Sequence, residues 1–427
     1  MMLDGQAKYD SYKDSGVPWI GAVPSEWDVL PGRACLYENK DKNTGMKEET
    51  VLSLSYGRVK VKPVEDQFGL MPESYETYQI VRPGDVIIRG TDLQNDVTSL
   101  RTGLAKDHGI ITSAYINLRP RPNISPIFLH YLLSSYDDMK VFYGLGSGLR
   151  QNLSYADFKY IGITVPDLDT QNRIVKFLDE KTAEIDAAVG KKRRLIDLLN
   201  EQKAILINRA VTKGLNPTAP MKDSGVDWIG EIPAHWRTEN PKWLFRHRKD
   251  RALRGEQQLA ATQKYGVIPQ HEFMDLEGRR VTQVFLDFEI LKHVEKGDFV
   301  ISMRSFQGGI EYSDHTGCVS SAYVAMEPGG HVYAPYYKYL LKSSRFIEAL
   351  QSTSNLVRDG QALRFDNFAM VLLPLVPLSE QCEIAAHIDQ VLDESSKLVS
   401  ATRREIRTLN EFKQTLIANA VTGKIKI

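Results

Sequence analysis

The chain has 427 residues, 54 acidic and 54 basic side chains, and a hydrophobic fraction of 42%. This length suits two or more domains, and the composition is that of a folded chain and not of a disordered or fibrous one. A formal net charge of zero excludes an overall basic coat, but a local basic face would still be enough to bind phosphates.

The N-terminus, the apolar runs and the cysteines bear on the compartment of the protein. The first ten residues lack the charged and then apolar pattern of a secretory signal, and no apolar run approaches the roughly 20 residues of a membrane span. Cys35, Cys318 and Cys382 are scattered and form no Cys-x-x-Cys pair. We therefore expect a cytoplasmic protein with no disulfide, no bound metal and no contact with a membrane.

The first distinctive segment of the chain occurs twice. KDSGVPWIGAVPSEW (13–27) and KDSGVDWIGEIPAHW (222–236) share ten of fifteen residues. Aspartate, serine and glycine in this order are typical of tight turns. We expect the tryptophans of both copies to anchor these turns and not to stack on a base.

The rest of the chain repeats in the same order, which predicts duplication of one unit of about 210 residues. Each unit begins with a mixed part that has short β-rich runs broken by glycine, proline, asparagine and aspartate, and one helical stretch near 125–142 in the first half. Its second part (169–213 and 379–423) has no proline and is predicted to be a long helix. The main matched segments are VRPGDVII (81–88) with VEKGDFVI (294–301), ITSAYINLRP (111–120) with VSSAYVAMEP (319–328), and TQNRIVKFLDE (170–180) with EQCEIAAHIDQ (380–390).

The two predicted helices share one heptad frame. Apolar residues spaced four and three apart predict that each helix buries a narrow stripe against a partner helix. The matched register favours an antiparallel pair, which would relate the two halves by a pseudo-two-fold axis and bring the end of the chain near its beginning. Two ordinary amphipathic helices on separate domains are the alternative. The seam residues are Leu178, Ile185, Val189, Ile196, Leu199 and Leu206 in the first helix and Ile388, Leu392, Val399, Ile406, Leu409 and Leu416 in the second.

No catalytic constellation stands out in the sequence. GLGSG (144–148) lacks the lysine of a phosphate-binding loop, and His271-Glu272 lacks the second histidine of a zinc-protease motif. The asparagine-proline pairs lack the following residues of an amino-methyltransferase site. We therefore predict a binding protein with no catalytic and no metal-binding residues.

Polar residues suited to reading DNA follow the Gly-Asp run in each half and precede each long helix. Arginine can donate two parallel hydrogen bonds to guanine, asparagine or glutamine can pair with adenine, and basic runs can contact phosphates. Solvated hairpins and ordinary loops are the alternative. The candidates in the first half are Arg58, Arg89, Asp92, Gln94, Asn95, Ser147, Arg150, Gln151 and Asn152. Those in the second half are Arg248, in the basic run FRHRKDRALRG (245–255), and Arg304, Gln307, Asn355, Arg358 and Gln361.

The repeated motifs together resemble the specificity subunit of type I DNA restriction–modification systems. They are the doubled KDSGV-x-WIG-x-x-P-x-x-W, Gly-Asp followed by a β run, Ser-Ala-Tyr, and P-x-x-x-x-Q-x-x-I leading into a helix that closes on Ala-Val-Thr. They span essentially the whole chain, in the same order twice.

This resemblance implies an α+β fold with two tandem mixed α/β target-recognition domains. Two long helices separate the domains and form an antiparallel coiled coil with internal pseudo-two-fold, circular symmetry. The expected boundaries are a lead-in at 1–19, the first target-recognition domain at 20–165, spacer helix 1 at 166–214, a linker with the repeated KDSGV at 215–228, the second target-recognition domain at 229–376 and spacer helix 2 at 377–427.

The resemblance also implies a function. Each domain would read one half of a bipartite DNA site, and the unlike loops of the two halves imply an asymmetric site. The chain would position two modification subunits, which bind S-adenosylmethionine and methylate adenine; motor–nuclease restriction subunits that use ATP and Mg would be further partners. The chain itself would bind no cofactor and catalyse no reaction. The alternative is a non-enzymatic coiled-coil scaffold whose paired domains bind protein partners.

Overall fold

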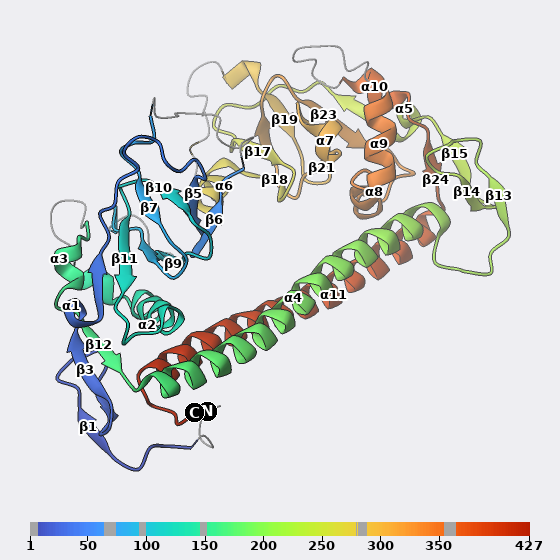
Figure 1. The fold of residues 1–427 in the computed structure, drawn as a ribbon. Coiled ribbons are helices and arrows are strands. Elements are labelled where there is room, and N and C mark those ends of the chain that lie inside the picture. Colours follow the sequence, from blue (N-terminus) through green and yellow to red (C-terminus); the bar gives the residue numbers. More distant parts are fainter. Residues whose placement is uncertain are drawn as a thin grey trace. The chain divides into compact units, whose positions relative to one another are not determined.

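The computed structural model of the chain describes residues 7–63, 74–93, 100–145, 152–278, 280, 288–353 and 364–427. It divides into two compact units, which we call unit 1 (residues 1–192 and 403–427) and unit 2 (residues 193–402). Each unit combines one mixed domain with part of each of two long helices, α4 (Leu168–Lys213) and α11 (Leu378–Val421) (Figure 1).

Unit 1 is built around a four-stranded antiparallel sheet in the order β4-β11-β8-β9. Two-stranded ladders β1-β2, β3-β12, β5-β6 and β7-β10 flank this sheet. The strands are β1 (Tyr12–Asp14), β2 (Ala22–Pro24), β3 (Asp28–Pro31), β4 (Leu36–Glu38), β5 (Leu52–Ser55), β6 (Arg58–Val61), β7 (Gln79–Val81), β8 (Val86–Ile88), β9 (Thr102–Leu104), β10 (Gly109–Ile111), β11 (Ile116–Pro120) and β12 (Gly162–Val165). The shorter helices are α1 (Gly32–Cys35), α2 (Pro126–Asp138), the 3-10 helix η2 (Val141–Gly144) and α3 (Tyr155–Phe158).

Unit 2 repeats this topology with a central antiparallel sheet in the order β16-β23-β20-β21. Its flanking ladders are β13-β14, β15-β24, β17-β18 and β19-β22, so every ladder of unit 1 has a counterpart. The strands are β13 (Met221–Asp223), β14 (Glu231–Pro233), β15 (Arg237–Glu239), β16 (Phe245–Arg248), β17 (Leu259–Thr262), β18 (Gly266–Pro269), β19 (Lys292–Val294), β20 (Phe299–Ile301), β21 (Glu311–Tyr312), β22 (Gly317–Val319), β23 (Val324–Pro328) and β24 (Leu373–Leu375). The shorter helices are α5 (Pro241–Leu244), α6 (Gln270–Glu277), η3 (Phe288–Ile290), α7 (Ser305–Gly308), α8 (Ala334–Leu340), α9 (Ser344–Ser352) and α10 (Phe365–Ala369). The predicted α+β fold with two tandem mixed domains is confirmed.

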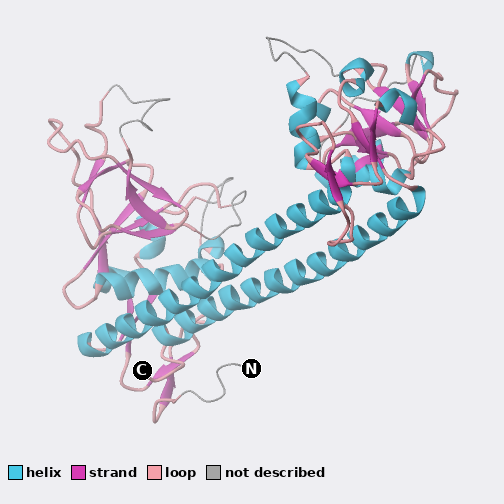
Figure 2. Cartoon of the chain, turned by 90° about the vertical axis from the view of Figure 1, so that its right-hand side faces the viewer, coloured by secondary structure: helices cyan, strands magenta, loops and turns pink. Residues whose placement is uncertain are grey.

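The long helices pack against each other in antiparallel orientation. Within unit 1, Lys192 of α4 pairs with Glu405 of α11, and the Asp186 carboxylate lies 2.7 Å from Lys413 Nζ. Residues with lower numbers on α4 therefore face residues with higher numbers on α11, as antiparallel packing requires. Figures 1 and 2 both show the two helices side by side. In each unit the apolar core of the mixed domain continues into this helix pair, so each domain is fixed to the helices by burial.

Most seam residues predicted from the heptad frame are buried or half-buried, but Leu206 is 38% exposed. The neighbouring Ile207 packs against the core of unit 2 in its place. A straight α-helix drifts by about 20° per heptad from a strict 3.5-residue repeat. Over the four heptads from Leu178 to Leu206 the drift amounts to about 80°, close to the roughly 100° between adjacent residues of a helix. The buried stripe therefore passes through Ile207 and not through Leu206.

The doubled KDSGV segment forms the joint between a long helix and a mixed domain. Gly214 ends α4 and Gly423 follows α11, both with φ near +70°, as is typical of glycines that terminate helices. A Cβ atom at Gly214 would lie 3.2 Å from the ring of Trp236, and one at Gly423 would lie 3.2 Å from the ring of Trp27. Both tryptophans are buried, so they anchor the joint, as expected. No described helix has the length and apolar character that crossing a membrane requires.

Candidate nucleic-acid interface

The Gly-Asp motif of each half forms a buried turn that starts the strand leading to a candidate loop. In unit 1, the Asp85 carboxylate accepts a hydrogen bond from the backbone N–H of Arg82 at 2.9 Å. Arg119 of β11 donates to both oxygens of Asp85, at 2.7 and 2.8 Å. Asp85 is therefore a structural residue that fixes the direction of β8 below the loop.

Arg248 holds the equivalent turn of unit 2. Its Nε donates to Asp298 at 2.6 Å and its Nη2 to the other carboxylate oxygen at 3.2 Å, while Asp250 and Glu295 lie within 3.6 Å. These hydrogen bonds, with that to Asp298 the largest cause, raise the pKa of Arg248. Its side chain is only 10% exposed, so the structure gives it an internal role, and it does not form part of the DNA-reading surface proposed below.

Two candidate loops of unit 1 lie against each other. The Asn152 side-chain oxygen accepts a hydrogen bond from the backbone N–H of Asp92 at 3.0 Å. Beside it, the backbone N–H of Leu153 donates to the carbonyl of Gly90 at 2.7 Å. Residues 89–92 after β8 and residues 152–153 before α3 thus lie together at one edge of the domain.

A buried arginine supports this edge from below. The guanidinium of Arg101 donates to the backbone carbonyls of Arg89 at 3.1 Å, Thr91 at 2.8 Å and Asp92 at 3.2 Å. Its own backbone N–H donates to the carboxylate of Asp137 on α2 at 2.8 Å. The loop backbone is therefore fixed to the core of unit 1. No motif marks Arg101 in the sequence, because its partners are backbone carbonyls that any residue could provide.

The β5-β6 hairpin carries Arg58 and packs against β9. A Cβ at Gly103 of β9 would lie 2.5 Å from Leu54 Cδ1, so a larger residue there would require the Leu54 side chain to move. Arg58 and the neighbouring Tyr56 are both exposed. Sequence reasoning missed Tyr56, although a Tyr-Gly pair recurs as Tyr265-Gly266 with the usual offset.

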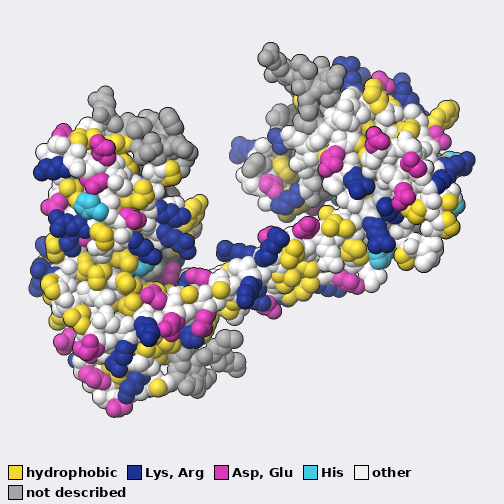
Figure 3. Space-filling view, turned by 45° about the vertical axis from the view of Figure 1, so that its right-hand side comes forward, with side chains coloured by type: hydrophobic (Ala, Val, Ile, Leu, Met, Phe, Trp, Pro, Cys, Tyr) yellow, Lys and Arg dark blue, Asp and Glu magenta, His cyan; other side chains and the backbone are white. Residues whose placement is uncertain are grey.

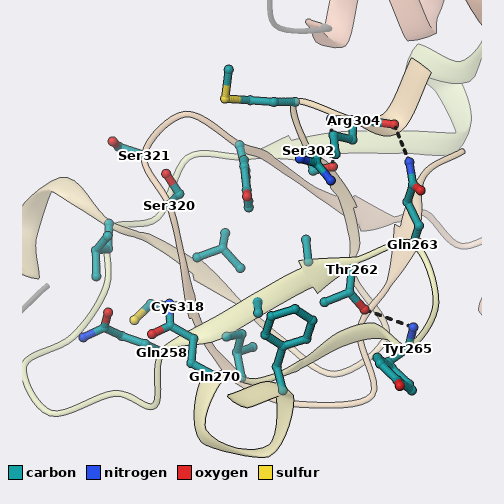
Figure 4. Close-up of a pocket in the computed structure, with 18 of the residues that line it drawn as sticks. Gln258, Thr262, Gln263, Tyr265, Gln270, Ser302, Arg304, Cys318, Ser320 and Ser321 are labelled. Atoms are coloured by element: carbon teal, nitrogen blue, oxygen red, sulfur yellow. Dashed lines mark hydrogen bonds between the residues drawn. The ribbon is translucent and has the colours of Figure 1, made fainter. Parts of the chain in front are cut away.

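In unit 2, the corresponding hairpin and loop are tied together. Arg304 and Gln307 are exposed at α7, and the Arg304 carbonyl accepts from the backbone N–H of Gln307 at 2.8 Å. It also accepts from Gln263 Nε2 at 3.3 Å (Figure 4). Lys342 Nζ donates to the carbonyl of Gln263 at 3.2 Å. Below this edge is a cavity of about 760 Å³, and its lining includes Gln258, Gln270, Phe273, Ser302 and Tyr323.

The remaining candidates lie outside the described residues. Accordingly, their placement stays a prediction. They are Gln94, Asn95, Ser147, Arg150, Gln151, Asn355, Arg358 and Gln361.

Charged side chains of both signs are mixed on the face that Figure 3 shows. Figure 3 shows lysine and arginine side chains interspersed with aspartate and glutamate on the visible face, with no single basic coat. Within the described ranges, no cluster of three or more His, Cys, Asp or Glu side chains is placed to hold a metal ion. At the candidate edges, individual polar and basic side chains are available for hydrogen bonds to bases and contacts to phosphates.

Comparisons with known proteins bear on the family. Residues 103–195, from β9 into α4, match the family model of the type I restriction modification DNA specificity domain. No curated protein matches the chain.

Two solved structures share the fold over nearly the whole chain. One comes from work on complex assembly and conformational transition of a type I R-M system; it is 18% identical, has a TM-score of 0.65, and covers 93% of this chain and 98% of its own. The other is the HsdS subunit from Thermoanaerobacter tengcongensis, which is 16% identical, has a TM-score of 0.51, and covers 94% of this chain and 98% of its own. The comparisons thus agree with the family that the repeated motifs indicate: residues 103–195 match the model of the type I restriction modification DNA specificity domain, and the chain shares the fold of an HsdS subunit.

Proposed function

We propose that this chain is the DNA-specificity subunit of a type I restriction–modification complex in which each unit reads one half of an asymmetric bipartite site. The observation that carries this proposal is one structural frame used twice with two different edges. Two domains with the same framework can each bind one part of a continuous duplex. The different side chains at their edges would recognise different bases in the two half-sites.

The frame is repeated down to single hydrogen bonds. Gln171 at the start of α4 accepts from the N–H of Ser125 at 2.8 Å and donates to the carbonyl of Pro166 at 2.8 Å. Gln381 at the start of α11 accepts from the N–H of Tyr333 at 2.7 Å and donates to the carbonyl of Val376 at 2.7 Å. Each glutamine closes the joint between its helix and its domain.

The edges do not repeat. Unit 1 has Arg89 and Asp92 after β8, on backbone that Arg101 supports, and Asn152 before α3. Unit 2 presents Arg304 and Gln307 on the short helix α7 at the same place after the Gly-Asp strand. Arginine, asparagine and glutamine at these positions favour direct readout of base edges in the major groove.

The proposed partners are double-stranded DNA and two modification subunits, with restriction subunits as further partners. In this proposal S-adenosylmethionine, ATP and Mg are bound by those subunits and none by this chain, which contributes recognition and not methyl transfer. The solved type I R-M assembly with the same fold supports a place within a larger complex.

The proposal is tested by mapping adenine methylation in cells that express this chain with its modification partner. Replacing residues 20–165 with the first domain of another specificity subunit should change one half of the methylated site and leave the other half intact. Alteration of both halves would contradict separate reading. A protein-binding scaffold would instead leave methylation unchanged and would lack the salt-dependent duplex binding that phosphate contacts produce.

A further inference from the structure

The tip of the β5-β6 hairpin holds a tyrosine in a backbone conformation that suits other residues better. Ser55 pairs with Arg58, so the turn consists of Tyr56 and Gly57 alone. Their φ angles are 48° and 72°, which place both residues in the left-handed region. Two-residue hairpin turns of this kind favour Asn-Gly, because asparagine tolerates positive φ far better than a bulky side chain does.

Packing within the chain does not explain the choice of tyrosine. The Tyr56 side chain is 86% exposed. In the described part of the chain it makes no ring contact and no side-chain hydrogen bond. Tyr56 thus has a φ angle that disfavours tyrosine, and its side chain is exposed to solvent. This combination indicates that the side chain contacts a partner outside the chain.

The charges of the hairpin favour a nucleic acid for that contact. Arg58 and Lys60 are exposed, while Val59 between them is buried, so the two basic side chains share the outer face of β6. Residues 51–63 contain no aspartate or glutamate. The hairpin therefore carries an exposed aromatic ring next to two exposed basic side chains. A ring can contact a base while basic side chains contact the neighbouring phosphates.

The corresponding tyrosine of unit 2 is bound within its own unit. Tyr265 lies in a three-residue turn, and its hydroxyl donates to Glu277 of α6 at 3.0 Å. Lys264 lies over its ring and also pairs with Glu277 at 3.3 Å. Only the hairpin of unit 1 presents its tip tyrosine to solvent.

We propose that Tyr56 is a DNA-contacting residue of the first target-recognition domain. Its ring contacts a base edge in a groove of the first half-site, and Arg58 and Lys60 bind the adjacent phosphates. This inference rests on the proposed function, since it assumes that unit 1 faces DNA.

The test uses the complex of this chain with its modification subunits and a duplex that carries the site found by methylation mapping. Tyr56→Asn places the residue preferred by the turn at the tip, so the melting temperature should stay the same or rise. Affinity for the specific duplex should fall about tenfold, the loss typical of one base contact, with an unchanged dependence on salt. Arg58→Gln should instead reduce the slope of log affinity against log salt by about one phosphate contact.

Tyr160→Asn is the matched control, because Tyr160 is 68% exposed in the same unit but lies after α3 beside Arg33. It should leave duplex affinity unchanged. If the wild-type complex binds the site and Tyr56→Asn binds equally well, the inference fails while the proposed function stands. A loss of stability in Tyr56→Asn would show a structural tyrosine, and a loss of assembly with the modification subunits would show a protein contact; either result overturns the inference. A wild-type complex without site preference would overturn the proposed function itself.

Discussion

Asp85 in unit 1 and Asp298 in unit 2 occupy the same buried turn, but their arginines come from different strands. Arg119 lies on β11, next to β8 in the sheet, whereas Arg248 lies on β16, two strands away from β20. The strand registers place Glu327 of unit 2 at the position of Arg119. The two units have therefore kept the buried ion pair while exchanging the residue that supplies its positive charge.

The candidate DNA-contacting edges of the two units also differ. Unlike the buried ion pair, an interaction lost at one edge is not replaced by an equivalent interaction from another residue. Tyr56 is exposed at its hairpin tip, while Tyr265 is bound to Glu277. Residues 89–93 after β8 form no helix or strand, while their counterpart after β20 forms α7. Buried groups must keep their partners because an unpaired charge or polar group is costly, whereas edge residues are free to change with the DNA they meet.

The largest expected effect comes from breaking the buried pair of unit 2. Arg248→Asn should destabilise this unit by about 3 kcal/mol, because it leaves the Asp298 carboxylate buried and unpaired. Adding Glu327→Arg supplies an arginine from the strand that carries it in unit 1, and should recover most of the loss. Hydrogen exchange of the β20 amides measures the change locally, which matters because a chain of two units need not unfold in one step.

Failure of the double variant to recover would show that the two arginine positions are not interchangeable, and the comparison drawn above would be wrong. The β8 amides of unit 1 are the internal control. Their exchange should not change in either variant.

A smaller effect is expected at the glutamines that close the two joints. Gln171→Leu leaves the N–H of Ser125 and the carbonyls of Asn123 and Pro166 without their side-chain partner, which should cost unit 1 about 2 kcal/mol. Gln381→Leu should cost unit 2 a similar amount, and each loss should be confined to its own unit. Asn172→Leu, at the exposed position next to Gln171, is the control and should change little. Equal loss in both units from one substitution would show that the joints are coupled.

Duplication and periodicity made most of the fold predictable. The repeated segments indicated two mixed domains, and the proline-free heptads indicated two paired helices, because both signals depend on many residues at once. The exposure of Leu206 was missed because a strict heptad ignores the drift of a straight helix. The anchoring tryptophans were predictable because bulky aromatic residues at a repeated joint are more often buried than free.

Individual site residues were less predictable. Arg248 belongs to a basic run, but its partner Asp298 lies fifty positions away, in the turn before β20. Arg101 binds backbone carbonyls, which leave no trace in side-chain patterns. Tyr56 becomes distinctive only through its φ angle and its exposure. Partners distant in the sequence and backbone angles are set by the tertiary fold, so local sequence could not reveal them.

The smallest expected effect concerns a half-buried carboxylate of unit 1 that unit 2 does not share. Burial, together with the nearby Asp137, raises the pKa of Asp138 on α2 to about 6, although Gln414 of α11 donates a hydrogen bond to it at 3.2 Å. The residue 208 positions later, at the offset of the surrounding segment, is the buried Phe346, which carries no charge. The folded chain thus holds the Asp138 proton more tightly than the unfolded chain, whose aspartates titrate near pH 4. The ionised carboxylate therefore costs stability above pH 6, and this cost disappears as the pH falls from 6 to 4.

Asp138→Asn keeps an acceptor for Gln414 and removes the charge. We expect unit 1 to gain about 1 kcal/mol at pH 8, a value reduced from the full pKa shift because the group is only partly buried, and to gain nothing at pH 4. Comparing variant with wild type at each pH cancels the titration of His130, whose pKa burial lowers to about 4. Hydrogen exchange of the α2 amides at both pH values measures the difference. A gain that persists at pH 4 would mean that the variant improves packing and that the charge itself costs unit 1 nothing.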